Sequence, residues 1–352
     1  MLVSELETPV PVVDLDILEQ NLLKMQAYCD LHGLRLRPHI KTHKCPEIAH
    51  MQVDRGAVGI TCQKLSEAEV MADAGLSDIH LSYPIVGVRK PERLANLARR
   101  VRVSVSVDSQ LGLQVAEEAA TAASQPITVW VDFDSGAGRT GVCTVAEALN
   151  LAQMACSSGR LLFGGLITYP LSPASQEFFE DAKGSFDLKA IEIPGFSGAG
   201  TPSAWSAHEI SGLTEVRHGT YVFHDRATVG VGAATMDECA VHVLATVVSR
   251  PSKDRAILDA GSKTLSSDRV PESIGSGFGL IREYPDSVVE RLYEEHALVS
   301  VPGTCTGLQI GERVRILPNH VCVVVNLHDE LIAARDDKVV KRLTIACRGK
   351  TL

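Results

Sequence analysis

The sequence predicts an α/β protein in which a (β/α)8 barrel of the TIM type is followed by a C-terminal all-β domain. Up to about residue 235, about eight short β-branched runs alternate with amphipathic helical patterns, as in a barrel of parallel strands. Beyond that point strand-like runs follow one another without long helices between them. A chain of 352 residues is long enough for two such domains.

The expected barrel strands are rich in Val, Ile, Leu and Phe, and most are followed by an amphipathic segment such as 144–159. They occupy 34–38, 58–62, 79–84, 101–107, 127–133, 162–169, 190–196 and 214–223. A doubly wound sheet is the competing fold. The barrel fold makes a testable prediction: reactive residues should lie just after the strands, at their carboxyl ends.

The strand-like runs of the second half lie at 240–251, 255–263, 312–327 and 338–349. We therefore predict three parts. An N-terminal segment, 1–15, pairs with the β domain; residues 16–235 form the barrel; residues 236–352 form the β domain, which also carries the candidate metal site described below.

Composition narrows the class of protein. With 45% apolar and 22% charged residues, the chain resembles an ordinary globular protein. Its net charge of −9 argues against a nucleic-acid partner. No apolar run is long enough to span a bilayer, and the acidic N-terminus does not resemble a signal peptide. Nine scattered cysteines without a CxxC motif predict reduced thiols and a cytoplasmic location.

The stretch RPHIKTHK, at 37–44, follows the first expected strand and is strongly basic. If the extended backbone continues, the odd-numbered side chains from Arg35 to His43 point into the barrel, which places Lys41 inside and Lys44 outside. A lysine at a barrel mouth is a candidate Schiff-base nucleophile. On these residues alone, a solvated basic loop is an equally good interpretation.

The segment 133–141 carries the glycine pattern GxGxxG after an expected strand. A dinucleotide site would also need an acidic residue at the end of the next strand, which has none. We therefore expect a tight turn that presents Arg139 at the barrel mouth. The alternative is a plain turn with a solvated arginine.

A glycine-rich loop, 195–205, follows the seventh expected strand. Gly198, Gly200 and Thr201 would leave backbone N–H groups exposed just before a helix, which predicts an anion site. Barrels often bind phosphate in the loops after strands seven and eight. The alternative is a glycine-rich loop with an ordinary Thr-Pro helix start.

His320 and Cys322 lie two residues apart in 317–329, which we expect to be a strand, so both would face the same side. Both residue types bind zinc, and two protein ligands would leave positions for water and substrate. A buried histidine and cysteine in a core strand is the alternative, and the two residues by themselves favour it.

Several motifs together resemble the D-threonine aldolase and D-serine dehydratase family, which belongs to the alanine racemase-like, fold-type III pyridoxal-phosphate enzymes. They are RPHIKTHKCPEIA, LSEAEVMADAG, GRTGV, SGAGTP, GTYVFHD, DAGSKTLSSD, EEH and PNHVC, which run from residue 37 to 322. The resemblance implies pyridoxal 5'-phosphate and a divalent metal (Zn, Mn or Mg) as cofactors. It also implies a homodimer, by analogy.

The resemblance implies a role for each candidate residue. Lys41 would hold the cofactor as a Schiff base, and Arg139 would contact its phenolate oxygen. Further contacts would come from Tyr169 near the pyridine nitrogen, Gln63 in the same pocket, and Gly198, Gly200, Thr201 and Tyr221 at the phosphate, while His320 and Cys322 would bind the metal.

Three departures from the family pattern bear on the chemistry. Ala199 replaces the middle glycine of the usual SGGGTP loop, and Ala297 replaces the glycine of EEHG. Relatives often carry a histidine shortly after the tyrosine that corresponds to Tyr169, whereas this chain continues with PLSPAS. The identity of the base is therefore open.

The resemblance implies retro-aldol cleavage of D-3-hydroxy amino acids such as D-threonine to glycine and an aldehyde. A dehydratase acting on D-serine or 3-hydroxy-D-aspartate would use the same parts and release a 2-oxo acid and ammonia. The sequence DAGSKTLSSD is more similar to the aldolase branch. A non-catalytic pyridoxal-phosphate carrier is the alternative of another class, although a second domain and the His–Cys pair argue against it.

Overall fold

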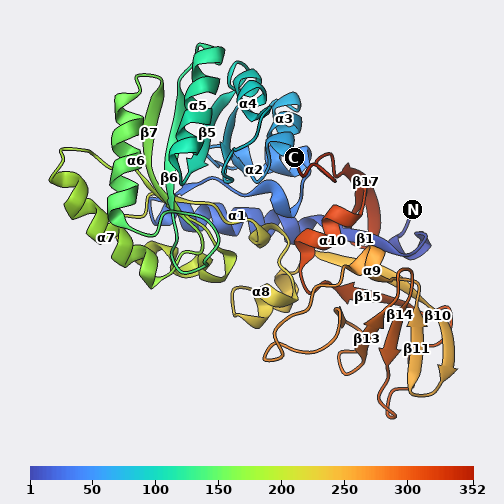
Figure 1. Ribbon diagram of the computed structural model, residues 1–352. Coiled ribbons are helices and arrows are strands. Elements are labelled where there is room, and N and C mark those ends of the chain that lie inside the picture. The colour runs from blue at the N-terminus through green and yellow to red at the C-terminus, as the bar shows by residue number, and fades with distance from the viewer. The chain divides into compact units, whose positions relative to one another are not determined.

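The computed structural model describes all residues, 1–352, and the chain forms two compact units (Figure 1). The barrel unit contains Met25–Lys41, Ile48–Gly219 and Lys350–Leu352. The β unit contains Met1–Lys24, Thr42–Glu47 and Thr220–Gly349. None of the helices combines the length and the hydrophobicity needed to cross a bilayer.

The barrel unit is built on eight parallel strands, in the order β2-β9-β8-β7-β6-β5-β4-β3. A parallel bridge between His39 and Thr61 connects the two ends of this order, and the N–H of Thr61 donates to the carbonyl of Pro38 (2.8 Å). The strands are β2 (Arg35–Leu36), β3 (Ile60–Cys62), β4 (Asp78–Leu81), β5 (Arg102–Val107), β6 (Ile127–Phe133), β7 (Leu161–Thr168), β8 (Phe196–Gly198) and β9 (Glu215–Val216).

Helices follow most of the barrel strands, and their apolar faces are buried against the sheet. They are α2 (Pro46–Val53), α3 (Leu65–Asp73), α4 (Lys90–Ala98), α5 (Gln110–Ala123), α6 (Val145–Ser157), α7 (Pro173–Asp187) and the 3-10 segment η3 (Thr201–Glu209). Helix α1 (Leu15–Leu31) instead precedes the first barrel strand. The side chains of Ser109 and Thr144 cap α5 and α6.

The last two barrel strands are shorter than the sequence predicts. No strand forms over 190–195, where Pro194 has no N–H to donate, and β8 begins only at Phe196. β9 ends at Val216, and Thr220–Val222 forms the 3-10 turn η4 instead of a strand. The residues after β8 and β9 are therefore loops at the carboxyl ends of strands.

The β unit holds a nine-stranded sheet, in the order β11-β14-β13-β12-β15-β10-β1-β16-β17. An additional pairing between β10 and β11 closes part of this sheet into a barrel. The strands are β1 (Val10–Asp14), β10 (Val241–Ser252), β11 (Arg255–Leu258), β12 (Leu280–Ile281), β13 (Val288–Leu292), β14 (Ala297–Ser300), β15 (Arg313–Leu317), β16 (Glu330–Arg335) and β17 (Lys338–Thr344). β1 pairs with both β10 and β16.

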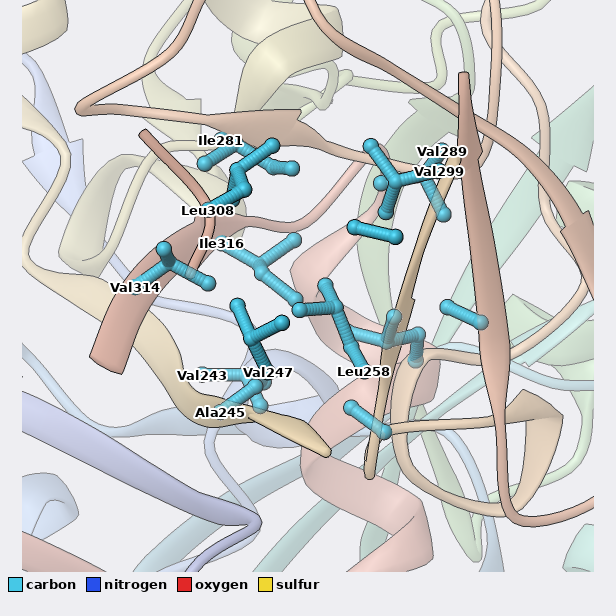
Figure 2. Close-up of a cluster of buried hydrophobic side chains, with 14 of the residues drawn as sticks. Val243, Ala245, Val247, Leu258, Ile281, Val289, Val299, Leu308, Val314 and Ile316 are labelled. Atoms are coloured by element: carbon cyan, nitrogen blue, oxygen red, sulfur yellow. The ribbon is translucent and has the colours of Figure 1, made fainter. Parts of the chain in front are cut away.

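Alternate residues of these strands fill the centre of the small barrel. Val243, Ala245 and Val247 of β10 point into the same cluster as Val314 and Ile316 of β15 (Figure 2). This period of two agrees with strands that have one buried face. The predicted combination of a TIM-type barrel and a separate β domain is confirmed, although the β unit also contains short helices.

The segment after β15 is one of these helices, so the prediction of a strand over 317–329 is wrong. Residues Val321–Leu327 form α10, with His320 as its N-cap. The buried positions are Val321, Val324 and Val325, which follow a helical period and not an alternating one. Tertiary packing thus overrides the preference of a valine-rich run for strands. Further short helices of the unit are α8 (Arg226–Gly230), α9 (Ser262–Leu265), η1 (Val3–Glu5) and η5 (Met236–Glu238).

Candidate active site

Lys41 lies in a short 3-10 turn, η2 (Ile40–Thr42), a few residues after β2. Strand-like hydrogen bonding continues to His39, but the turn begins at Ile40, so the alternation used to place Lys41 does not extend to it. Its side chain is nevertheless directed to a residue of the barrel mouth, because Nζ lies 5.8 Å from the centroid of the Tyr169 ring. The turn and not the strand orients Lys41.

Lys44 has a different environment. It is buried, adopts a left-handed backbone conformation with φ of 53°, and donates from Nζ to the carbonyl of Cys347 (3.4 Å). This contact lies within the β unit. The ammonium of Lys44 therefore has a structural partner, whereas that of Lys41 lies over an aromatic ring.

Arg139 meets the same ring. Its guanidinium carbon lies 4.8 Å from the centroid of Tyr169, which follows β7 and is 40% exposed. The loop that carries Arg139 is held by Asp134, whose Oδ1 accepts hydrogen bonds from the N–H groups of Gly136, Ala137 and Gly138. Lys41, Arg139 and Tyr169, predicted from three separate motifs, thus lie together at the carboxyl ends of the strands.

Gln63 is engaged with the lysine turn. Its Oε1 lies 3.0 Å from Nε2 of His39, and its Nε2 donates to the carbonyl of Ser82 (3.2 Å). Nδ1 of His39 in turn accepts from the N–H of Lys41 (3.3 Å), so Nε2 must carry the imidazole proton. His39 was not predicted as a site residue, but it links Gln63 to the turn of Lys41.

The glycine-rich loop after β8 has the geometry of an anion site. Gly200 has φ of +133° and precedes η3, and the N–H groups of Gly200 and Thr201 donate to no other group of the chain. A Cβ at Gly198 would lie 2.5 Å from a methyl group of Leu171, so a larger residue there would require the Leu171 side chain to shift. Ala199 does not have a positive φ, which explains why the alanine is tolerated.

The barrel interior below this mouth is polar. Arg217 is fully buried and donates to Ser197 (2.8 Å) and to the carbonyl of Thr168 (3.0 Å), and burial lowers its pKa to about 10. Asp132 of β6 accepts from the hydroxyl of Thr140 (3.0 Å), and burial raises its pKa to about 6. Through Thr140, Asp132 anchors the loop of Arg139. Sequence reasoning identified neither Asp132 nor Arg217.

The raised pKa of Asp132 makes a prediction about stability. An acid whose folded pKa exceeds its unfolded pKa binds more protons when folded, so its ionisation destabilises the protein as the pH rises from about 4 to 6. Asp132→Asn removes this charge. The difference in free energy of unfolding, variant minus natural protein, should therefore increase by about 1–3 kcal/mol as the pH rises over that range. Urea unfolding at pH 4.5 and pH 7.5 tests this; an unchanged difference would contradict it.

His320 and Cys322 lie next to each other at the start of α10, in the β unit. The Cys322 thiol donates to Oγ1 of Thr42 (3.3 Å), and Oγ1 of Thr220 lies 4.0 Å from the sulfur. No group of three or more His, Cys, Asp or Glu side chains suited to a metal ion occurs. A helix start, and not a strand, therefore brings the predicted pair together, and it offers one nitrogen and one sulfur.

Asp225, the N-cap of α8, is a partner of this pair that the sequence did not reveal. Its Oδ2 lies 3.0 Å from Nδ1 of His320 and accepts from the N–H of Val321 (3.0 Å). The hydrogen bonds of His320 with Asp225 and Cys322 raise the pKa of the imidazole to about 11. In the sequence, Asp225 stands out only as the last residue of the motif GTYVFHD.

Tyr221, the remaining candidate, lies in η4 of the β unit and is 1% exposed. It follows Thr220, whose hydroxyl is the group near the Cys322 sulfur. The predicted residues therefore form two groups. Lys41, Gln63, Arg139, Tyr169, Gly198, Gly200 and Thr201 belong to the barrel unit, whereas Tyr221, His320 and Cys322 belong to the β unit.

Comparisons with known proteins agree with both units. Residues 13–227 match the family model of the alanine racemase N-terminal domain, and residues 240–334 match that of a putative serine dehydratase domain. The chain is 37% identical to a D-threonine aldolase of an Arthrobacter species, over 98% of this chain and 94% of that protein. It is 32% identical to the D-threo-3-hydroxyaspartate dehydratase of a Delftia species, over 90% and 91%.

Solved structures show the same fold. The crystal structure of D-threonine aldolase from Filomicrobium marinum superposes with a TM-score of 0.89 at 31% identity, and the match covers 99% of this chain and 98% of that one. The structure of the Delftia dehydratase has a TM-score of 0.86 at 29% identity, covering 97% and 98%.

Proposed function

Because the chain belongs to the D-threonine aldolase and D-serine dehydratase family of alanine racemase-like, fold-type III pyridoxal-phosphate lyases, we propose that it cleaves D-3-hydroxy amino acids such as D-threonine to glycine and an aldehyde. The observation that carries this proposal is the convergence of Lys41 and Arg139 on the ring of Tyr169. The barrel segment 16–235 would hold the cofactor, and the segment 236–352 would carry the metal.

The residues of the barrel unit fit pyridoxal phosphate. The N–H groups of Gly200 and Thr201 would hold the phosphate, and Lys41 would bind the cofactor covalently. Arg139 would place a positive charge beside the phenolate oxygen, and Tyr169 would lie near the pyridine nitrogen. When bound, the cofactor supplies an electron sink for the charge left on Cα after bond cleavage.

The pair in the β unit fits a divalent metal. Zinc binds well to an imidazole nitrogen and a thiolate, whereas magnesium and manganese favour oxygen donors. We therefore propose zinc ahead of manganese or magnesium. With only two protein ligands, the remaining positions would be open to water and substrate. Such an ion supplies a positive charge that lowers the pKa of a substrate hydroxyl. Thr42, which accepts from Cys322, is the residue after Lys41 in the chain.

A dehydratase acting on D-serine or 3-hydroxy-D-aspartate is the second candidate. The 32% identity to the Delftia dehydratase supports it. In this reaction Nζ of Lys41 would remove the Cα proton, and the 3-hydroxyl would leave. A non-catalytic carrier is not supported, because the relatives that match nearly the whole chain are an aldolase and a dehydratase. The homodimer stays a prediction.

Product analysis distinguishes the two reactions. The purified protein, loaded with pyridoxal phosphate, is incubated with D-threonine and with D-serine in the presence of Zn²⁺ or Mn²⁺. We expect glycine and acetaldehyde from D-threonine. A 2-oxo acid and ammonia would instead establish the dehydratase. Absence of turnover with both substrates and with 3-hydroxy-D-aspartate would contradict the proposal. The L-enantiomers, which should not react, are the control for stereospecificity.

A further inference from the structure

We propose that Asp225 is a positioning residue that fixes both metal-binding groups: it orients the imidazole of His320 and sets the helix start that carries Cys322. This inference rests on the proposed metal site. It adds a residue 95 positions earlier in the sequence, which no motif connects with metal binding.

The contacts of Asp225 are divided between its two carboxylate oxygens. Oδ2 accepts from Nδ1 of His320 and from the N–H of Val321, both at 3.0 Å. Oδ1 accepts from the N–H of Thr228 (2.9 Å) and caps α8. Asp225 is completely buried, whereas the His320 side chain is 41% exposed. A rigid carboxylate thus holds a histidine that an ion in solution can reach.

The hydrogen bond to Nδ1 selects the ligating atom. An ionised carboxylate can only accept, so Nδ1 of His320 must carry a proton. In the neutral imidazole this leaves the lone pair on Nε2, which is the atom then available to a metal ion. Metal-binding histidines commonly donate their second N–H to a carboxylate, which fixes the ring and increases its basicity.

The bond to Val321 concerns the second ligand. The first N–H groups of a helix have no partner within the helix, and Oδ2 satisfies that of Val321, the first residue of α10. Cys322 is the next residue. Oδ2 of Asp225 therefore fixes the backbone next to Cys322 as well as the ring of His320. Removing this oxygen should disturb both proposed ligands.

Two variants separate this role from helix capping. Asp225→Ser keeps a good N-cap for α8 but is too short to reach His320. Thr228→Val removes the hydroxyl that exchanges hydrogen bonds with the backbone of Asp225, but leaves Oδ2 in place. The first should lose metal affinity, whereas the second should lose only stability, by about 1 kcal/mol.

The test measures binding of Co²⁺ and Zn²⁺ by chelator competition and follows the Co²⁺–thiolate absorbance. We expect the dissociation constant to rise about 10–100-fold in Asp225→Ser and to stay within about twofold in Thr228→Val. Asp225→Asn, which keeps the volume, should also bind more weakly because it loses the charge. Unchanged affinity in folded Asp225→Ser or Asp225→Asn would overturn this inference. Failure of the natural protein to bind either metal would instead overturn the metal site itself.

Discussion

Lys41→Ala should abolish turnover and the visible absorbance of the lysine-bound cofactor. Nζ of Lys41 is an amine that lies 5.8 Å from the centroid of the Tyr169 ring. A Schiff base cannot form without this amine. We expect activity to fall by about 10³-fold or more, equivalent to about 4 kcal/mol of activation free energy. Absorbance spectra of the purified variant, before and after borohydride reduction, measure the covalent link directly.

Lys44→Ala is the matched control. Lys44 is three residues away and has the same chemistry, but its Nζ is hydrogen-bonded to the carbonyl of Cys347. The variant should keep the cofactor absorbance and lose stability, because Lys44 is buried. If Lys44→Ala loses the absorbance and Lys41→Ala keeps it, the assignment of the nucleophile is wrong.

The choice of Lys41 shows what strand alternation can and cannot predict. Arg37, one of the odd-numbered residues, does lie in the barrel and forms ion pairs with Asp78 and Glu215. Strand-like pairing continues to His39, but a turn begins at Ile40, so the same alternation does not apply to Lys41. A sequence pattern predicts the face of a residue only as long as the backbone conformation is maintained.

The start of α10 shows a second limit. A run of valines favours a strand by local propensity, and only the long-range contacts of Asp225 and the packing of Val324 in the core of the β unit decide for a helix. The pairing of His320 with Cys322 was predicted for the wrong geometric reason. Contacts between residues far apart in the sequence, such as His320 and Asp225 or Thr42 and Cys322, leave no periodicity that a single sequence could reveal.

Fold class and the order of the barrel strands were easier to predict, because each depends on local patterns repeated eight times. Local residue patterns predicted Arg139 at the barrel mouth and an anion site at Gly198–Thr201, and the family motifs implied their cofactor roles; the structure adds their geometry. The sequence could not predict that Asp132 and Arg217 are buried polar residues of the site, because no local pattern shows which side chains meet inside the barrel.

Cys322→Ala should remove the metal requirement together with most of the activity. In the proposed site, the Cys322 thiolate would be one of only two protein ligands, so its loss should release the ion, as a chelator should do with the natural protein. A metal that polarises a substrate oxygen contributes several kcal/mol, so we expect a loss of about 10²–10³-fold. The cofactor absorbance should be retained, since Lys41 is unchanged.

Cys305→Ala provides the comparison for that experiment. Cys305 is another free thiol of the β unit and packs against its hydrophobic core, so its loss should affect only stability. Activity and bound metal, determined by elemental analysis, are measured for both variants. Full activity in Cys322→Ala, or chelator-resistant activity in the natural protein, would refute a catalytic metal at this pair and leave Lys41 as the only group at the site with a chemical role.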